Sequence, residues 1–322
     1  MAELFSVREV YEARERIKEY VYRTPLEESL YLSDNGRKYF FKLESLQTVK
    51  SFKLRGALSK MTTLTEEQRR RGVATISSGN HGASVSYAAK RLGIENAVVI
   101  VPETTPKAKV DKISFYGARV LLLGADYDQS HALGMQYIEA NGLTYIDPYY
   151  DDPKIYGGQG TVGLEILEQN PEIDTIVVPI GGGGLITGIA VAAKAVKPEV
   201  RIIGVQTEAC PAMIAAYRDN VFYEEYPIIG DTVCDALVGG VGQLSFQLLR
   251  HYVDDLIAVR EASIRKAVKY MLLEEKYIVE GGSATAVAAV MDARERVGGK
   301  NIALVMSGGN IDGKLIRELC TE

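Results

Sequence analysis

Eight short, mostly apolar segments recur along this chain of 322 residues, separated by longer segments with helical spacing. The short segments span residues 39–43, 73–76, 97–101, 119–123, 175–178, 201–205, 256–259 and 302–306. Strands that are apolar on both faces are typical of parallel sheets covered by helices on both sides. The pattern therefore predicts a doubly wound α/β protein, in which ligands bind at strand-to-helix turns.

Charge and cysteine content exclude several classes of function. The chain has 37 basic and 42 acidic residues, a balance that argues against a nucleic-acid or anionic-membrane partner. Three cysteines without a CxxC pair and only three histidines predict no metal site and the reduced thiols of a cytoplasmic protein. Residues 175–193 are long and apolar enough for a membrane span, but the glycines at 181–184 would break it. We expect a strand, a turn and a buried helix there.

A lysine in an apolar setting is the first candidate for chemistry. Lys53 lies among small and apolar residues in the segment 51–57. Partial burial would lower its pKa and make the amine available for Schiff-base chemistry. A lysine near a helix start is more often a solvated surface residue, so this segment alone leaves both readings open.

Three further motifs follow predicted strands. Residues 77–82, Ser-Ser-Gly-Asn-His-Gly, place backbone N–H groups at a helix start, where they bind anions such as a carboxylate. The glycines at 181–184 allow backbone amides to surround a phosphate. Ser307 opens a Ser-Gly-Gly-Asn segment and offers a hydroxyl to a ring nitrogen. Individually, each motif also fits a capped helix, a tightly packed turn or a strand end.

Together, in this order, the four motifs give a clear resemblance to a known family. The chain resembles the fold-type II pyridoxal-phosphate (PLP) enzymes of the serine/threonine dehydratase and serine racemase family over nearly its whole length. Further shared segments lie at 24–26, 46–47, 102–103, 158–161 and 280–284. The resemblance implies a tryptophan synthase β-like fold of two three-layer α/β lobes with mainly parallel sheets. Residues 1–62 and 149–322 would form a large PLP-binding domain, and residues 63–148 a small mobile domain.

The resemblance also implies which residues bind the cofactor. Lys53 would hold PLP as a Schiff base and later act as the base on the substrate Cα proton. Phe52 would pack against the cofactor ring, and Asn80 would bind its phenolic oxygen. The phosphate would be held by Gly181, Gly182, Gly183, Gly184 and Leu185. Ser307 would meet the pyridine nitrogen.

The same resemblance implies the substrate site. The residues expected to bind the carboxylate of a small amino acid are Ser78, Gly79, Asn80 and His81. Because the Ser307 hydroxyl cannot keep the ring nitrogen protonated as an aspartate would, the cofactor is a weaker electron sink. This favours β-elimination, and we expect a threonine/serine dehydratase that forms a 2-oxo acid and ammonia.

Ser78 carries the main alternative. In racemase-type relatives this serine is the acid and base on the face of the cofactor opposite the lysine. Two bases on opposite faces permit reprotonation from either side, so serine or hydroxyaspartate racemase activity stays open.

Other implications of the resemblance concern cofactors, partners and competing functions. Gln206 and Ala212 stand where metal-dependent racemases carry acidic ligands, so no divalent cation is expected, although Glu208 could substitute. A homodimer without a C-terminal regulatory domain is expected by analogy. A non-catalytic PLP sensor and a cysteine synthase are competing hypotheses. Retention of Lys53, Asn80 and the glycine loop argues against the first, and His81 argues against the second.

Overall fold

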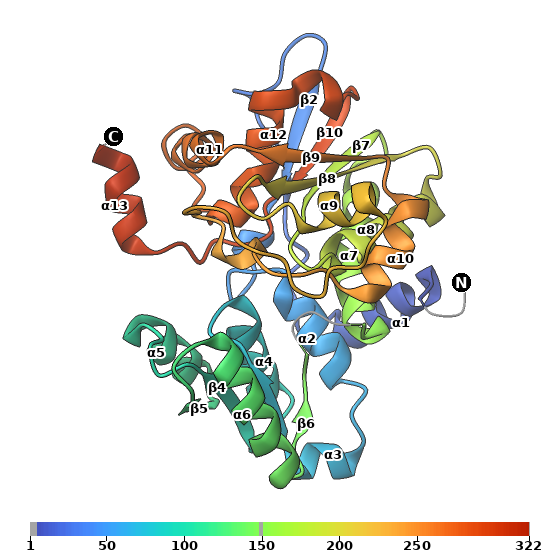
Figure 1. The fold of residues 1–322 in the computed structure, drawn as a ribbon. Coiled ribbons are helices and arrows are strands. Elements are labelled where there is room, and N and C mark those ends of the chain that lie inside the picture. The colour runs from blue at the N-terminus through green and yellow to red at the C-terminus, as the bar shows by residue number, and fades with distance from the viewer. Residues whose placement is uncertain (1–4, 148–150, 322) are drawn as a thin grey trace.

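The computed structural model describes residues 5–147 and 151–321 and contains two β-sheets with helices on both faces of each (Figure 1). The larger sheet has six strands, in the order β1 (Leu26–Glu28), β2 (Lys38–Lys42), β10 (Asn301–Val305), β7 (Thr175–Pro179), β8 (Arg201–Thr207) and β9 (Asp255–Val259). Only β1 runs antiparallel to its neighbour in this sheet. The predicted class, α/β with mainly parallel sheets, is confirmed.

The smaller sheet is wholly parallel. Its strands follow the order β5 (Arg119–Leu122), β4 (Ala97–Val101), β3 (Val73–Ile76) and β6 (Thr144–Tyr145). Every residue of β3 and β4 is buried, as expected for strands covered on both faces. These strands lie inside the range predicted for a small domain. The boundaries and mobility of that domain stay predictions, and its predicted end at residues 148–149 lies outside the described residues.

Helices complete the layers around both sheets. Those associated with the larger sheet are α1 (Val7–Ile17), α2 (Lys53–Met61), α7 (Pro153–Gln169), α8 (Gly184–Val196), α9 (Ala212–Asp219), α10 (Gln243–Tyr252), α11 (Glu261–Leu273), α12 (Gly281–Val297) and α13 (Gly313–Thr321). Those of the smaller lobe are α3 (Glu66–Arg71), α4 (Asn80–Arg91), α5 (Lys107–Tyr116) and α6 (Tyr127–Ala140). Two short 3₁₀ helices, η1 (Glu44–Leu46) and η2 (Asp235–Leu237), lie in connections.

The alternation of side chains along each strand explains the three layers. In β10, Ile302 and Leu304 pack in the core formed with α11 and α12, whereas Ala303 and Val305 pack in the core formed with α7 and α8. In β4, Val99 packs on the side of α2 and α4, and Val98 on the side of α6. Both faces of each sheet are therefore apolar, which is why these strands read as continuous apolar segments.

Two short strands and one helix cap differ from what the sequence predicts. β1 has three residues, two of them glutamates, and β6 has two residues, so neither carries an apolar pattern. Ser6 followed by Glu9 three residues later has the sequence pattern of a capping box, but the Ser6 side chain, at the N-cap of α1, makes no cap hydrogen bond. Glu9 instead accepts hydrogen bonds from Arg16 (2.6 Å) and Lys154 (2.5 Å), because these cations lie beside it in the folded chain.

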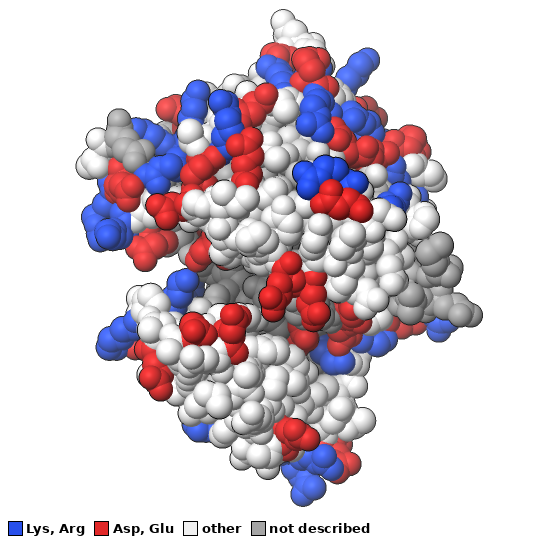
Figure 2. Space-filling view, viewed as in Figure 1, with Lys and Arg blue, Asp and Glu red and all other residues white. Residues whose placement is uncertain are grey.

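Across the described ranges 5–147 and 151–321, no helix has the length and apolar character needed to cross a bilayer. The apolar stretch at 175–193 forms β7, a glycine turn and most of α8, as expected. On the face shown in Figure 2, basic and acidic side chains are interspersed over the larger lobe, and the outline is indented between α5 and that lobe.

Helices α7 and α8 cross in close backbone contact, and this contact places the turn that precedes α8. A Cβ atom added at Gly188 would lie 2.5 Å from Tyr156 O and 2.6 Å from Gly160 N. A Cβ added at Gly160 would lie 2.7 Å from Gly188 O. Since backbone atoms cannot move aside, only glycine fits at either position.

Gly188→Ala should therefore lower the free energy of unfolding by about 1–3 kcal/mol, because the helices must separate to admit a methyl group. Urea denaturation followed by circular dichroism measures this change. The control is Gly36→Ala in an exposed turn, where the nearest atom to the new Cβ is 3.5 Å away, and which should change stability by less than about 0.5 kcal/mol. Equal stability of the two variants would contradict the proposed packing.

Candidate active site

The four predicted motifs come together between the carboxyl edge of the larger sheet and the start of α2. Lys53 is the first residue of α2, and Ser307 follows the end of β10. Phe52 N donates to Ser307 O at 3.0 Å, and Ser51 forms a β-bridge with Gly308. These backbone contacts join the lysine segment to the Ser-Gly-Gly-Asn segment, although about 250 residues separate them in the sequence.

Lys53 has the electrostatic setting that its sequence neighbours predict. Its side chain is only partly exposed, and its Nζ lies 5.5 Å from the centroid of the Phe52 ring. Burial lowers the pKa of Lys53 from 10.5 to about 8, against the opposing influence of the Asp147 and Glu280 carboxylates. A substantial fraction of its amine is therefore uncharged at mildly alkaline pH, which nucleophilic chemistry requires.

Asn80 is oriented by two neighbours that the sequence did not assign to the site. Asn310 Nδ2 donates to Asn80 Oδ1 at 2.6 Å, and Asn80 Nδ2 donates to Glu280 Oε1 at 2.8 Å. Because a side-chain amide carries two N–H groups, Asn80 retains the capacity to donate a second hydrogen bond. Asn310 and Glu280 lie in segments that carry the family resemblance, but no periodicity or spacing in the sequence predicts that they hydrogen-bond to Asn80.

Glu280 is a buried carboxyl group with a raised pKa. Burial and the nearby Asp235 raise the pKa of Glu280 to about 7, although hydrogen bonds from Asn80 and from the backbone of Asn310 act in the opposite direction. Asn310 N donates to Glu280 Oε2 at 3.1 Å. Glu280 therefore exchanges a proton near neutral pH within hydrogen-bond distance of Asn80.

Ser307 is buried at the end of β10. Its Oγ lies 3.1 Å from Ser283 Oγ at the start of α12. Ser283 Oγ also exchanges hydrogen bonds of 2.6 Å with the N–H and carbonyl of Gly308, which fixes the turn. A hydroxyl hydrogen rotates about its C–O bond, so Ser307 can donate either to Ser283 or to another acceptor.

The segment predicted to bind a carboxylate forms the start of α4. Ser78 is partly exposed, Gly79 is exposed, and α4 begins at Asn80. His81 is buried, and its Nε2 lies 3.0 Å from Ile146 O. Burial and the Lys53 charge lower the pKa of His81 to about 3, so the ring is neutral and donates to Ile146. Only the backbone N–H of His81 is then available to an anion.

The glycine turn between β7 and α8 has the form of a phosphate cradle. Gly183 has a φ of +101°, and a Cβ there would lie 2.6 Å from the Cβ of Ser245. A Cβ at Gly184 would lie 2.9 Å from the Tyr156 ring. Gly183 and Gly184 are therefore restricted to glycine, and the first N–H groups of α8 have no partner within the helix, as an anion site requires. Leu185 is buried beneath the turn.

Polar side chains hold this turn from below. Thr187 Oγ1 donates to Gly183 O at 2.8 Å and lies 3.0 Å from Ser245 Oγ. Tyr156 OH lies 2.9 Å from the same Ser245 Oγ. The amine, the glycine cradle and the neutral hydroxyl of Ser307 together fit PLP, which presents an aldehyde, a phosphate and a pyridine nitrogen.

The position considered for a divalent cation has another role. Gln206 Oε1 accepts hydrogen bonds from Met213 N (2.9 Å) and Ile214 N (3.1 Å), which attaches α9 to β8. In the part of the chain that the structure describes, no three His, Cys, Asp or Glu side chains group closely enough to hold a metal ion.

Glu280→Gln should change how stability depends on pH. Between pH 4.5 and 7 the folded cofactor-free protein binds more protons than the unfolded chain, because the pKa of Glu280 is higher when folded. The free energy of unfolding therefore falls as the pH rises from 4.5 to 7, by up to about 3 kcal/mol. Glu280→Gln should remove this loss in denaturant unfolding at pH 5 and pH 8. Glu66→Gln, at an exposed position, should lose as much stability between pH 5 and pH 8 as the wild type. An equal loss in Glu280→Gln would contradict the role of Glu280.

Comparison with known proteins places this constellation in a family. Residues 17–308 match the model of the pyridoxal-phosphate dependent enzyme family. The L-threonine ammonia-lyase of Thermotoga maritima is 40% identical over 316 residues, which cover 97% of this chain and 77% of that protein. A catabolic L-threonine dehydratase of Staphylococcus aureus is 39% identical over 318 residues, covering 97% of this chain and 90% of that protein.

Solved structures agree with this placement. Maize serine racemase has a TM-score of 0.90 at 35% identity, with 99% of this chain and 97% of that chain covered. The processed form of threonine deaminase isoform 2 from Solanum lycopersicum has a TM-score of 0.90 at 32% identity, with 98% of this chain and 93% of that chain covered. The chain that brings Lys53, the glycine cradle and Ser307 together therefore belongs to the family of pyridoxal-phosphate dependent enzymes.

Proposed function

We propose that the protein is a threonine/serine dehydratase that converts a small hydroxy-amino acid into a 2-oxo acid and ammonia. The observation that carries the proposal is the placement of Lys53, with its lowered pKa, beside a phosphate cradle and a neutral hydroxyl. The two curated relatives described above, named as an L-threonine ammonia-lyase and an L-threonine dehydratase, support threonine as a substrate.

The residues present would hold the cofactor at several points. The glycine cradle at Gly181, Gly182, Gly183 and Gly184, with Leu185 below, would bind its phosphate through backbone N–H groups. Phe52 would pack against its ring, and Asn80 would donate to its phenolic oxygen. Lys53 would bind its aldehyde carbon. When bound, PLP supplies an electron sink that stabilises negative charge at the substrate Cα.

The side chains of this chain then divide the reaction between them. The start of α4, at Ser78, Gly79, Asn80 and His81, would bind the substrate carboxylate through N–H and O–H groups. Lys53, once released from the cofactor, would take the Cα proton, because its lowered pKa leaves the amine ready to accept one. Loss of the β-hydroxyl as water, followed by addition of water, yields the 2-oxo acid and ammonia.

Ser307 supports elimination over reactions that need a long-lived carbanion. The residue at the end of β10 is a hydroxyl hydrogen-bonded to another hydroxyl, and not a carboxylate. A neutral hydroxyl cannot hold a pyridine nitrogen in its protonated form, so the electron sink is weaker. The negative charge formed at the substrate Cα is then better released by loss of a group from the β-carbon than kept on the cofactor ring.

Racemisation is a second candidate activity, and Ser78 is the observation that favours it. Its hydroxyl stands on the loop before α4, partly exposed, as expected for a second acid and base. The likeness to maize serine racemase supports the same activity.

A cytoplasmic homodimer is also part of the proposal. Leu30 (82% exposed) and Tyr31 (68% exposed) supply apolar surface that a second copy would cover.

A substrate panel tests these assignments. The PLP-loaded protein should release 2-oxo acids from L-threonine and L-serine, measured by coupled reduction of the oxo acid. Ser78→Ala should abolish any interconversion of D- and L-serine, followed by chiral chromatography, while 2-oxo acid release from the L-amino acids continues. Ser114→Ala, at an exposed serine of α5 outside the site, is the control and should keep both activities.

Two outcomes would contradict the proposal. No 2-oxo acid from any hydroxy-amino acid would indicate a non-catalytic PLP-binding protein. Racemisation that persists in Ser78→Ala would contradict the assignment of Ser78 as the second acid and base.

A further inference from the structure

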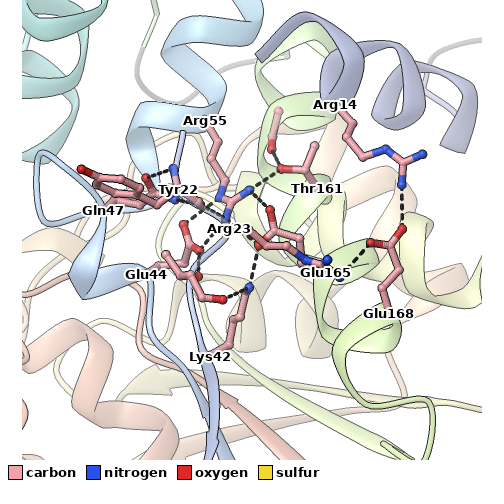
Figure 3. Close-up of polar contacts among 12 residues, drawn as sticks. Arg14, Tyr22, Arg23, Lys42, Glu44, Gln47, Arg55, Thr161, Glu165 and Glu168 are labelled. Atoms are coloured by element: carbon pink, nitrogen blue, oxygen red, sulfur yellow. Dashed lines mark hydrogen bonds and ion pairs between the residues drawn. The ribbon is translucent and has the colours of Figure 1, made fainter. Parts of the chain in front are cut away.

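A buried cluster of charges surrounds Arg55, which lies on the same helix as Lys53. Arg55 follows Lys53 by two residues in the first turn of α2, and its side chain has no solvent exposure. Figure 3 shows Arg55 with the residues around it. Its guanidinium binds Glu44 of η1 in a bidentate manner, with Nε to Oε2 and Nη2 to Oε1 both at 2.8 Å. This fork fixes both the distance and the plane of the guanidinium.

A second carboxylate holds the opposite edge of the same guanidinium. Arg55 Nη1 donates to Glu165 Oε1 at 2.7 Å, and Nη2 donates to Glu165 Oε2 at 2.9 Å. Nη1 also donates to Thr161 Oγ1 at 3.0 Å. Glu165 and Thr161 lie on α7, so Arg55 connects α2 with both η1 and α7. We call this set of Arg55, Glu44 and Glu165 the clamp.

A lysine outside α2 balances the charge of the clamp. Lys42 Nζ donates to Glu165 Oε2 at 2.6 Å, to Thr24 O at 2.7 Å and to Gln169 Oε1 at 2.9 Å. Two cations and two carboxylates then sum to zero charge in the interior. Lys42 lies at the end of β2, so it attaches α7 to the sheet without touching α2.

Close packing leaves α2 little room to move against α7. A Cβ added at Gly158 would lie 2.3 Å from Arg55 O, and one added at Gly56 would lie 2.9 Å from Gln159 Nε2. The backbones of the two helices are therefore in direct contact beside the clamp. A small rotation of α2 would break the bidentate pairing and produce a steric clash at these glycines.

The start of α2 has few local features that fix a helix: Ser51 Oγ accepts a long hydrogen bond of 3.3 Å from Lys53 N. Phe52 occupies the N-cap position and makes no side-chain cap, and no acidic residue lies in the first turn. A cationic residue such as Lys53 is unfavourable at a helix N-terminus. The position of this end therefore depends on tertiary contacts, which include the clamp made by Arg55 and the packing of Leu54 in the core.

We propose that Arg55 is a positioning residue for Lys53: the clamp fixes the first turn of α2, and thereby the place of the Lys53 amine relative to the glycine cradle and Ser307. This inference rests on the proposed function, in which Lys53 holds the cofactor. The carboxylates that Arg55 binds, Glu44 and Glu165, are not among the residues assigned to the site, so Arg55 acts through the helix that it shares with Lys53.

Two substitutions that each remove one cation from the cluster provide the test. Arg55→Met removes the cation on α2, whereas Lys42→Met removes the cation on β2 and leaves both bidentate pairs of Arg55 in place. Arg55→Lys retains the charge but loses the fork. Each holoenzyme is examined for kcat, for the pH dependence of the absorbance of the bound cofactor, and for unfolding by circular dichroism.

Arg55→Met and Arg55→Lys should lower kcat by about tenfold or more and shift the pH midpoint of the cofactor absorbance, since a displaced catalytic group loses reactivity steeply. Lys42→Met should retain the wild-type kcat and the wild-type pH midpoint of the cofactor absorbance, even if it is destabilised as much as Arg55→Met. Thr161→Val, which deletes one hydrogen bond to Arg55, should give a smaller change in the same direction and keeps the test available should Arg55→Met not fold.

Wild-type kcat and absorbance in Arg55→Lys and Thr161→Val would overturn the inference, as would equal losses in Lys42→Met and Arg55→Met, which would indicate general destabilisation. Failure of the proposed function is distinguishable. If Lys53 does not hold the cofactor, the absorbance of bound PLP will be the same in the wild type and in Lys53→Ala.

Discussion

The buried pairing of Arg55 with Glu44 and Glu165 is the interaction on which the arrangement of the site depends. It joins α2, η1 and α7, and the side chains of Arg55 and Glu44 have no solvent exposure. Breaking a buried pair by removing one partner typically costs about 3–5 kcal/mol, whereas replacing the whole set with apolar residues is often neutral. The cluster is thus better explained by the position it imposes on α2 than by net stability.

The chemistry of the site follows from groups that are partly deprived of water. Burial weakens the proton affinity of Lys53 and strengthens that of Glu280, so both exchange protons closer to neutral pH than they would in solution. The Ser307 hydroxyl adds no charge, and the glycine turn contributes only backbone N–H groups. The Lys53 amine, the glycine turn and the uncharged Ser307 hydroxyl together suit elimination from a hydroxy-amino acid.

The sequence predicts the sheets and the four motifs because their signals are local. All eight short apolar segments form strands; β3, β4, β7, β8 and β10 are almost wholly buried, whereas β2, β5 and β9 are partly exposed. The contacts among distant residues are not predictable in this way: Arg55 and Glu165 are 110 residues apart, and Asn80 and Glu280 are 200 apart. β1 and β6 are too short to carry a pattern, and Glu9 pairs with cations brought by other parts of the fold.

The central claim is that Lys53, held in place by α2, is the residue that binds PLP covalently. Borohydride reduction of the PLP-loaded protein, followed by tryptic digestion and mass spectrometry, tests it most directly. The account predicts a single pyridoxyl group on the peptide that contains Lys53. A pyridoxyl group on another lysine, or no covalent label on protein that has bound PLP, would contradict it.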